Sequence, residues 1–320
     1  MRCWGAIFAA IFAIGASGVI LIGGVRLATA QSEESKTWSG SEPQVVLAEN
    51  FLLPEFPGEL RVYRIVGPEV DESQAERLAE ALGFAGVREV GGRFVADENS
   101  WHLEVDRETG YLWCGEVDRV YGVPEGAPLV SPEEASVLAE SFLAEKGLLP
   151  EDAYLEEVRR DEIRVSAVDP ETGKIWERGT GRGMVQVWFG RRVDNLGVVG
   201  SGCGIAVSLA GEEVVGVRRC WKEYTPLGSF PLLPFHEILA DVRSKGVNRL
   251  LEGVKGAVYG ERVVIRGVRL AYLDDSRIHR DQGFLLPVYG LTVDLGRGHL
   301  LEVFFPAVAL PGAPYFEVCG

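Results

Sequence analysis

The chain contains nearly the same eight-residue phrase twice, "DRETGYLW" starting at Asp106 and "DPETGKIW" starting at Asp169. An aspartate opens a turn well because its side chain accepts hydrogen bonds from backbone N–H groups two or three residues further on. Gly110 and Gly173 suit the left-handed conformation that precedes a returning strand. Each phrase therefore predicts the same reversal between two strands, and its recurrence predicts a repeated architecture.

A third, weaker copy lies near the C-terminal end. The stretch "DLGRGHL" keeps the aspartate at Asp294, the glycine at Gly298 and an apolar residue after it. It predicts a third turn of the same kind, further from its helix than the first two.

Each of the first two phrases follows a segment with helical periodicity and a start signal. Asp71 with Gln74, and Ser131 with Glu134, form capping-box patterns, and Pro132 suits the first helical position. A third helix is expected with Ile238, Leu239 and Val242 on one face and Gly246 at its end.

Strand patterns fill the stretches between these helices, and Pro/Gly-rich connections are expected at 121–132 and 224–234. The strands are expected at 60–66, 88–98, 101–106, 111–117, 157–168, 175–178, 184–192, 198–209, 213–224, 260–275, 283–294 and 299–309. This order predicts an α+β protein with repeated units, each one helix packed on an antiparallel β-meander. The expected units are 59–122, 129–224 (enlarged) and 232–320, after an N-terminal segment 1–30 and a linker 31–58.

Residues 3–24 carry no charge, and about 20 apolar residues suffice to span a bilayer. The run is long enough for a retained membrane anchor, whereas Ala28-Thr29-Ala30 forms an A-x-A pattern that favours cleavage near Ala30. Both alternatives place the rest of the chain outside the cytoplasm. A buried helix of a cytoplasmic domain is the third alternative, disfavoured by the abrupt change to polar sequence after the run.

The formal net charge is −15, which repels phosphate backbones and argues against nucleic-acid binding. No pair of cysteines has C-x-x-C spacing. If Gly211-Glu212 forms a two-residue hairpin turn, Cys203 and Cys220 lie directly opposite in a non-hydrogen-bonded pair, about 4.5 Å apart between Cα atoms. That separation predicts a disulfide, with two reduced cysteines on one face as the alternative. A pairing of Cys114 with Cys319 stays open.

Other candidate sites favour structural roles. The acidic turns offer too few oxygens for a typical calcium loop. Gly200, Gly202 and Gly204 precede a strand rather than a helix, so they favour close backbone approach over a phosphate loop. Five tryptophans in or beside strands favour core packing over an exposed binding platform: Trp101, Trp113, Trp176, Trp188 and Trp221.

The four histidines do not form a metal-binding motif: they are His102, His236, His279 and His299. A triad assembled from distant residues is not visible in a sequence. No residue is therefore predicted to be catalytic, to bind a cofactor or to ligate a metal.

At these residues the chain resembles the PepSY domain: "DESQAERLAEALG" with "WHLEVDRETGYLW", and "SPEEASVLAESFLAEKG" with "IRVSAVDPETGKIW". The N-terminal apolar segment, the repeated units and the late "LLPVYGLTVD…HLLEVFFPAV" are also similar to YycH/YycI-type accessory proteins, which sit outside the membrane and act on a sensor kinase. The resemblance implies a fold and a binding or regulatory role, and it carries over no catalytic residue.

The sequence therefore predicts a non-catalytic extracytoplasmic protein that binds a membrane protein or peptide partner such as a sensor or a protease. A binding module for a small or cell-wall ligand is the first alternative, and an unrecognised hydrolase is the second. The sequence does not determine the oligomeric state.

Overall fold

The computed structural model describes the backbone of residues 19–20, 43–120, 130–168, 175–251, 261–277, 282–296 and 300–309, and the side chains of these except 19–20, 161–168 and 175–183. Apart from 19–20, the apolar segment 3–24 lies outside these ranges. Within the ranges described, no helix is long and apolar enough to cross a membrane.

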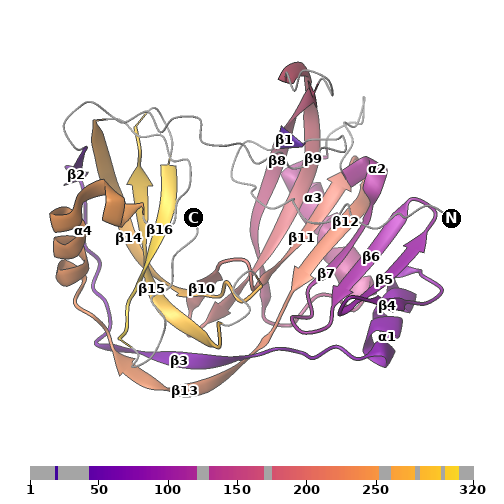
Figure 1. Ribbon diagram of the computed structural model, residues 1–320, viewed down its shortest axis with the longest axis horizontal. Coiled ribbons are helices and arrows are strands. Elements are labelled where there is room, and N and C mark those ends of the chain that lie inside the picture. Colours follow the sequence, from indigo (N-terminus) through magenta and orange to yellow (C-terminus); the bar gives the residue numbers. More distant parts are fainter. Residues whose placement is uncertain are drawn as a thin grey trace.

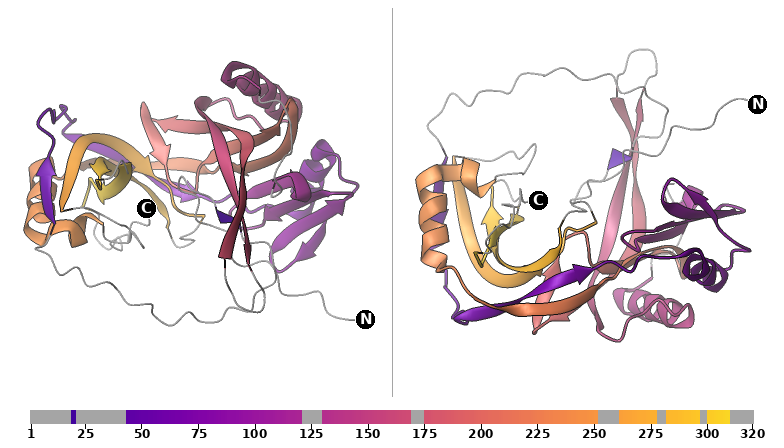
Figure 2. Two further views of the ribbon diagram at one scale, coloured as in Figure 1. Left: turned by 90° about the horizontal axis from the view of Figure 1, so that it is seen from above. Right: turned by 60° about the horizontal axis from the view of Figure 1, so that its bottom comes forward.

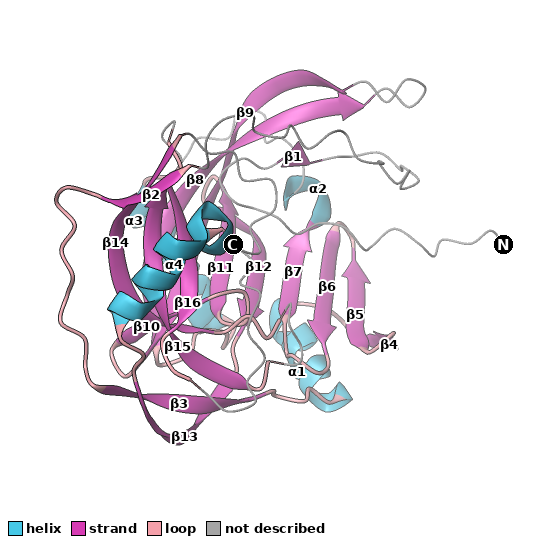
Figure 3. Ribbon diagram, turned by 60° about the vertical axis from the view of Figure 1, so that its left-hand side comes forward, coloured by secondary structure: helices cyan, strands magenta, loops and turns pink. Residues whose placement is uncertain are grey.

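The protein is predominantly β-sheet with few helices, so the α+β expectation holds only in part (Figure 3). The described strands form one hydrogen-bonded network. In its N-terminal part the strands are β1 (Val19–Ile20), β2 (Gln44–Leu47), β3 (Glu59–Val66), β4 (Arg88–Val90), β5 (Arg93–Glu98), β6 (Trp101–Asp106), β7 (Leu112–Glu116) and β8 (Ala153–Val168). They continue with β9 (Ile175–Val193), β10 (Leu196–Val199), β11 (Gly204–Ala210), β12 (Glu213–Cys220), β13 (Glu223–Pro231), β14 (Arg262–Leu273), β15 (Phe284–Asp294) and β16 (Leu300–Pro306). The helices are α1 (Glu72–Leu82), α2 (Val117–Val120), α3 (Pro132–Glu145) and α4 (Phe235–Leu250).

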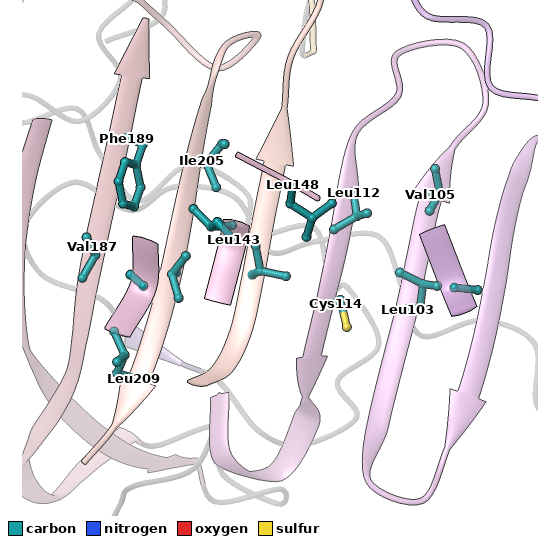
Figure 4. Packing of buried hydrophobic residues seen from close by; sticks show 14 of the residues in the cluster. Leu103, Val105, Leu112, Cys114, Leu143, Leu148, Val187, Phe189, Ile205 and Leu209 are labelled. Carbon is teal, nitrogen blue, oxygen red and sulfur yellow. The ribbon is translucent and has the colours of Figure 1, made fainter. Parts of the chain in front are cut away.

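The larger part of the network, which we call the N-sheet, has the strand order β8-β9-β11-β12-β7-β6-β5-β4 and lies at the right of Figure 1. It consists of two helix-then-strands segments joined edge to edge, because β12 pairs antiparallel with β7 and Val217 lies opposite Cys114. Both α1 and α3 contribute to one shared hydrophobic core, in which Leu143 of α3 lies near Ile205 of β11 (Figure 4).

The predicted helix starts are confirmed. The Asp71 carboxylate accepts a hydrogen bond from the Gln74 backbone N–H at 2.7 Å, and the Gln74 side chain accepts one from the Asp71 N–H at 2.8 Å. Ser131 and Glu134 form the same reciprocal box at the start of α3. The structure also has a short helix, α2, that the sequence analysis did not predict.

The smaller part, which we call the C-sheet, has the order β2-β14-β15-β16 and packs against α4. The helix end predicted at Gly246 is an interruption instead: this glycine has φ 68° and ψ −157°, and helix resumes after it as far as Leu250. β10 connects the two sheets, since it pairs with β9 on one side and with β14 on the other.

The connection expected at 224–234 is wrong, because most of it is strand β13. β13 pairs antiparallel with β3, and the two run side by side along the bottom of Figure 1 and between the two sheets in Figure 2. We call this pair the base ribbon. β3 thus pairs with β13 and β15 rather than with the strands that follow α1. The strand expected at 198–209 is likewise two strands, β10 and β11, separated at 200–203.

The first phrase forms the predicted turn. Asp106 Oδ1 accepts hydrogen bonds from the Thr109 N–H at 2.9 Å and from the Glu108 N–H at 3.2 Å, and Gly110 has φ 62°. Asp169 and Gly173 of the second phrase lie outside the described residues, as does Gly298 of the third. Asp294 ends β15 and accepts a hydrogen bond from the Gly296 N–H at 2.8 Å.

The predicted opposition of Cys203 and Cys220 is wrong. The hairpin pairs as expected near its turn, with Leu209 opposite Val214, but a β-bulge then shifts the register so that Ser208 faces Gly216. As a result Gly204 lies opposite Cys220, and both Cys203 and Cys220 are free thiols. Cys114 is a buried free thiol, and Cys319 lies outside the described residues.

Candidate interaction surface

The two faces of the N-sheet differ, because α1 and α3 share the core on one face only. Side chains alternate between faces along each strand, so residues next to the core positions point to the opposite face, which we call the outer face. α2 lies at one end of the outer face, because Val120 Cγ2 is the atom nearest to a Cβ added at Gly115 or at Gly216, at 3.1 and 3.0 Å. Trp188 lies opposite Ala206, Ala206 opposite Arg218, and Arg218 opposite Trp113, across four neighbouring strands. We call Trp188, Ala206, Arg218 and Trp113 the arginine–tryptophan row.

Two arginines lie over the Trp188 ring. The guanidinium carbon of Arg218 is 4.5 Å from the ring centroid, and that of Arg159 on β8 is 5.2 Å from it. Ala206 lies between Trp188 and Arg218 in the row, and its small side chain lets the two larger ones meet. Arg159 is exposed and also pairs with Glu157, at 2.6 Å between Nε and Oε2.

A third arginine reaches the same region from the loop after β14. The guanidinium carbon of Arg277 lies 4.5 Å from the centroid of the Tyr111 ring. Burial raises the pKa of the Tyr111 hydroxyl, while the charges of Arg277 and Arg218 oppose that rise. Arg159, Arg218 and Arg277 therefore influence one another electrostatically on this face.

Arg218 differs from its neighbours in having no hydrogen bond or ion pair with any described residue; its stacking on Trp188 is the contact found. Burial lowers the pKa of its guanidinium, and the charges of Arg277 and Arg159 lower it further against an opposing effect of Tyr111. The Trp188 indole N–H is buried and likewise has no acceptor among the described residues. Two strong donors thus lie together without acceptors.

On the β5 and β6 part of this face, the polar side chains have hydrogen-bond or ion-pair partners. His102 Nδ1 lies 2.6 Å from Asp97 Oδ1, and this hydrogen bond is the main cause that lowers the pKa of Asp97. The His102 ring lies 5.8 Å from the Trp113 ring, and Arg93 pairs with Glu104 at 2.9 Å.

A second polar cluster, which we call the junction, lies where the N-sheet meets the C-sheet and the base ribbon. Lys222 donates to the Ser276 hydroxyl, which donates to Asp274, and the Tyr224 hydroxyl donates to the other Asp274 oxygen at 2.7 Å. Lys222, Asp274 and Ser276 are all buried. Burial, followed by the Asp274 charge, raises the Tyr224 pKa.

The glycines at 200 and 202 belong to this junction. A Cβ on Gly202 would lie 1.8 Å from Asp274 Oδ1, and one on Gly200 would lie 2.4 Å from the Asp274 carbonyl oxygen. The Gly202 N–H donates to that carbonyl at 2.7 Å. The prediction that these glycines permit close backbone approach is confirmed.

The Lys222–Ser276 contact has the residue types of a serine–lysine nucleophile. Its hydroxyl, however, is 4% exposed and already engaged by both Lys222 and Asp274. A substrate carbonyl could reach it only if the junction opened. The geometry therefore favours a structural role, in which the buried charges of Lys222 and Asp274 neutralise each other through Ser276.

The tryptophans divide between the two faces. Trp101 and Trp221 pack against the core as predicted, whereas Trp113 and Trp188 lie on the outer face, and the side chain of Trp176 lies outside the description. His236 lies in the first turn of α4, and His279 and His299 lie outside the described residues.

Sequence reasoning missed Arg218. The usable signal was "VRR" at 217–219, because two consecutive arginines on a half-buried strand must point to opposite faces. Arg219 indeed points to the helix side, where its Nε donates to the Leu148 carbonyl at 3.1 Å.

No family model matches the chain, and no curated protein matches its sequence. Among solved structures, the crystal structure of YycH from Bacillus subtilis is similar, with 15% identity and a TM-score of 0.43. The similarity covers 80% of this chain and 55% of that one, so the chain spans about half the length of YycH. It is a likeness of fold alone.

Proposed function

We propose that this chain is a non-catalytic extracytoplasmic interaction or regulatory protein, which binds a protein partner such as a sensor or a protease at the membrane surface. The observation that carries the proposal is the outer face of the N-sheet, where tryptophan and arginine side chains gather in neighbouring strand positions. Aromatic residues and arginine are the types that contribute most to binding at protein interfaces.

The same face has the rigidity that a binding surface needs. Its residues project from the paired strands β9, β11, β12 and β7, which are fixed from behind by the core shared with α1 and α3. A preorganised surface loses little conformational entropy on binding. We infer that the two helix-then-strands segments of the N-sheet are PepSY-like units, in agreement with the resemblance of their sequences.

The location outside the cytoplasm rests on the uncharged segment 3–24 and the A-x-A pattern that ends at Ala30. If the segment is retained, it anchors the protein and raises its effective concentration near a membrane partner. N-terminal sequencing of the mature protein distinguishes retention from cleavage, and protection of residues after 30 from protease added to intact cells would contradict the location.

The interaction is tested by placing a photo-crosslinking amino acid at one position on each face of the N-sheet. Glu157 is exposed and lies opposite Trp188 in the strand register, on the outer face. Val137 on α3 is 62% exposed and serves as the matched control on the helix side. In native membranes we expect a discrete crosslinked protein from position 157 and none from 137. No crosslink from 157, or the same product from both positions, would contradict the proposal.

A further inference from the structure

Arg218 has no hydrogen bond or ion pair with any described residue, in a chain that has 47 Asp and Glu residues against 32 Lys and Arg residues. Its charged neighbours include two further arginines, Arg159 and Arg277. We infer that the Arg218 guanidinium, stacked on the Trp188 ring, forms a binding site for a carboxylate group of an acidic peptide segment in the partner protein.

The energetic argument starts from burial. A half-buried guanidinium without an acceptor among the described residues loses hydration that no group there replaces. Stacking on the Trp188 ring offsets only part of this loss. A ligand that supplies acceptors removes the remainder on binding.

A carboxylate fits the guanidinium. The guanidinium is a planar fork that matches the two oxygens of a carboxylate. Because its central carbon lies 4.5 Å from the centroid of the Trp188 ring, the guanidinium is already positioned by the stacking before the ligand arrives.

The flanking arginines indicate a segment with more than one acid. The guanidinium carbons of Arg218 and Arg159 lie 4.5 Å and 5.2 Å from the centroid of the same Trp188 ring, so the two charges are close together. An extended segment of about three residues, at roughly 3.3–3.6 Å per residue, spans the largest separation that these distances allow. Arg159 and Arg277 would attract its other carboxylates and accelerate the encounter.

The site is tested with the full-length protein and a fluorescent, end-blocked hexaglutamate peptide, with hexaglutamine as the uncharged control. Arg218→Gln removes the proposed contact, and Arg219→Gln removes the same charge on the opposite face of β12. We expect hexaglutamate to bind the unchanged protein, to bind Arg218→Gln about tenfold more weakly and to bind Arg219→Gln within about twofold, where tenfold corresponds to about 1.4 kcal/mol. Hexaglutamine should not bind.

Three results would overturn the inference: no binding of hexaglutamate, equal binding to both variants, or displacement of the peptide by inorganic phosphate at concentrations at which acetate has no effect. The last would assign the site to phosphate rather than to a carboxylate.

The inference rests on the proposed function, but the two fail differently. Combining the crosslinker at position 157 with Arg218→Gln in native membranes separates them. Reduced capture of the crosslinked protein supports both. If the amount of crosslinked protein does not fall, the proposed interaction surface is still supported and the carboxylate site is contradicted.

Discussion

Lys222 and Arg218 lie four residues apart on consecutive parts of the chain, and both are cations largely removed from water. Lys222 bonds to Ser276 and through it to the buried carboxylate of Asp274, whereas Arg218 has no acceptor among the described residues. The junction is one place where the protein neutralises a buried cation with its own carboxylate. By contrast, Arg218 lies on the outer face, opposite α1 and α3, where a partner can supply the missing acceptor.

The junction should be the more costly of the two to break. Lys222→Met leaves Asp274 as a buried carboxylate without its counter-charge, and removing one member of a buried pair typically costs about 3–5 kcal/mol of unfolding free energy. Urea unfolding measures the loss. Lys245→Met is the control, because Lys245 is exposed and its pair with Asp241 contributes less than about 1 kcal/mol. A similar small loss for both variants would contradict the structural role of the junction.

Close packing at the junction should be the next most sensitive feature. In Gly202→Ala the new Cβ would meet Asp274 Oδ1 at 1.8 Å, so the strands must shift, at about 1–3 kcal/mol. Gly267→Ala in β14 is the matched control, because nothing lies within 4 Å of its added Cβ. Equal unfolding free energies for the two variants would show that the loop at 200–203 accommodates the added Cβ without loss of stability.

Alkaline pH should weaken the junction region through its thiols. Burial raises the pKa of Cys220 from 9.0 to about 11, so the folded state favours the neutral thiol. That contribution is fully present below pH 9 and is lost as pH rises from 9 towards 11, by about 1.4 kcal/mol per pH unit for one such group. The unfolding free energy of the unchanged protein should therefore fall between pH 9 and pH 10.5, whereas that of Cys220→Ala lacks this contribution. The difference in unfolding free energy between the two proteins should be smaller at pH 10.5 than below pH 9, and parallel pH profiles would contradict the raised pKa.

The helix-side arginine should show a smaller effect. Arg219→Gln loses the hydrogen bond to the Leu148 carbonyl, which typically contributes about 0.5–1.5 kcal/mol. Thermal or urea unfolding measures it, and an unfolding free energy unchanged within error would indicate that the carbonyl finds another donor.

Sequence reasoning reached the local features of the fold because those are encoded by neighbouring residues. The capping boxes at Asp71 and Ser131 and the turn at Asp106 each depend on a few consecutive side chains. It failed where distant segments meet. The pairing of β3 with β13 has no local signature, and Lys222 meets a serine 54 residues away in the sequence.

The disulfide prediction was wrong because of a local irregularity in the hairpin. Its geometry assumed an uninterrupted hairpin, but one bulge between Leu209 and Ser208 shifts every pair beyond it by one residue. The alternation of apolar and polar residues in a sequence does not predict the position of such a bulge. The same alternation did contain the clue to Arg218, because two adjacent arginines on a strand cannot both face solvent.

The most direct test compares Arg218→Gln with Arg219→Gln for stability and binding in parallel. If the unpaired guanidinium serves a partner, Arg218→Gln changes the unfolding free energy by less than about 0.5 kcal/mol, or raises it, while weakening hexaglutamate binding about tenfold. If Arg218 is instead a structural residue held by Trp188, its loss destabilises the protein at least as much as Arg219→Gln and leaves peptide affinity unchanged. That second result would contradict the account.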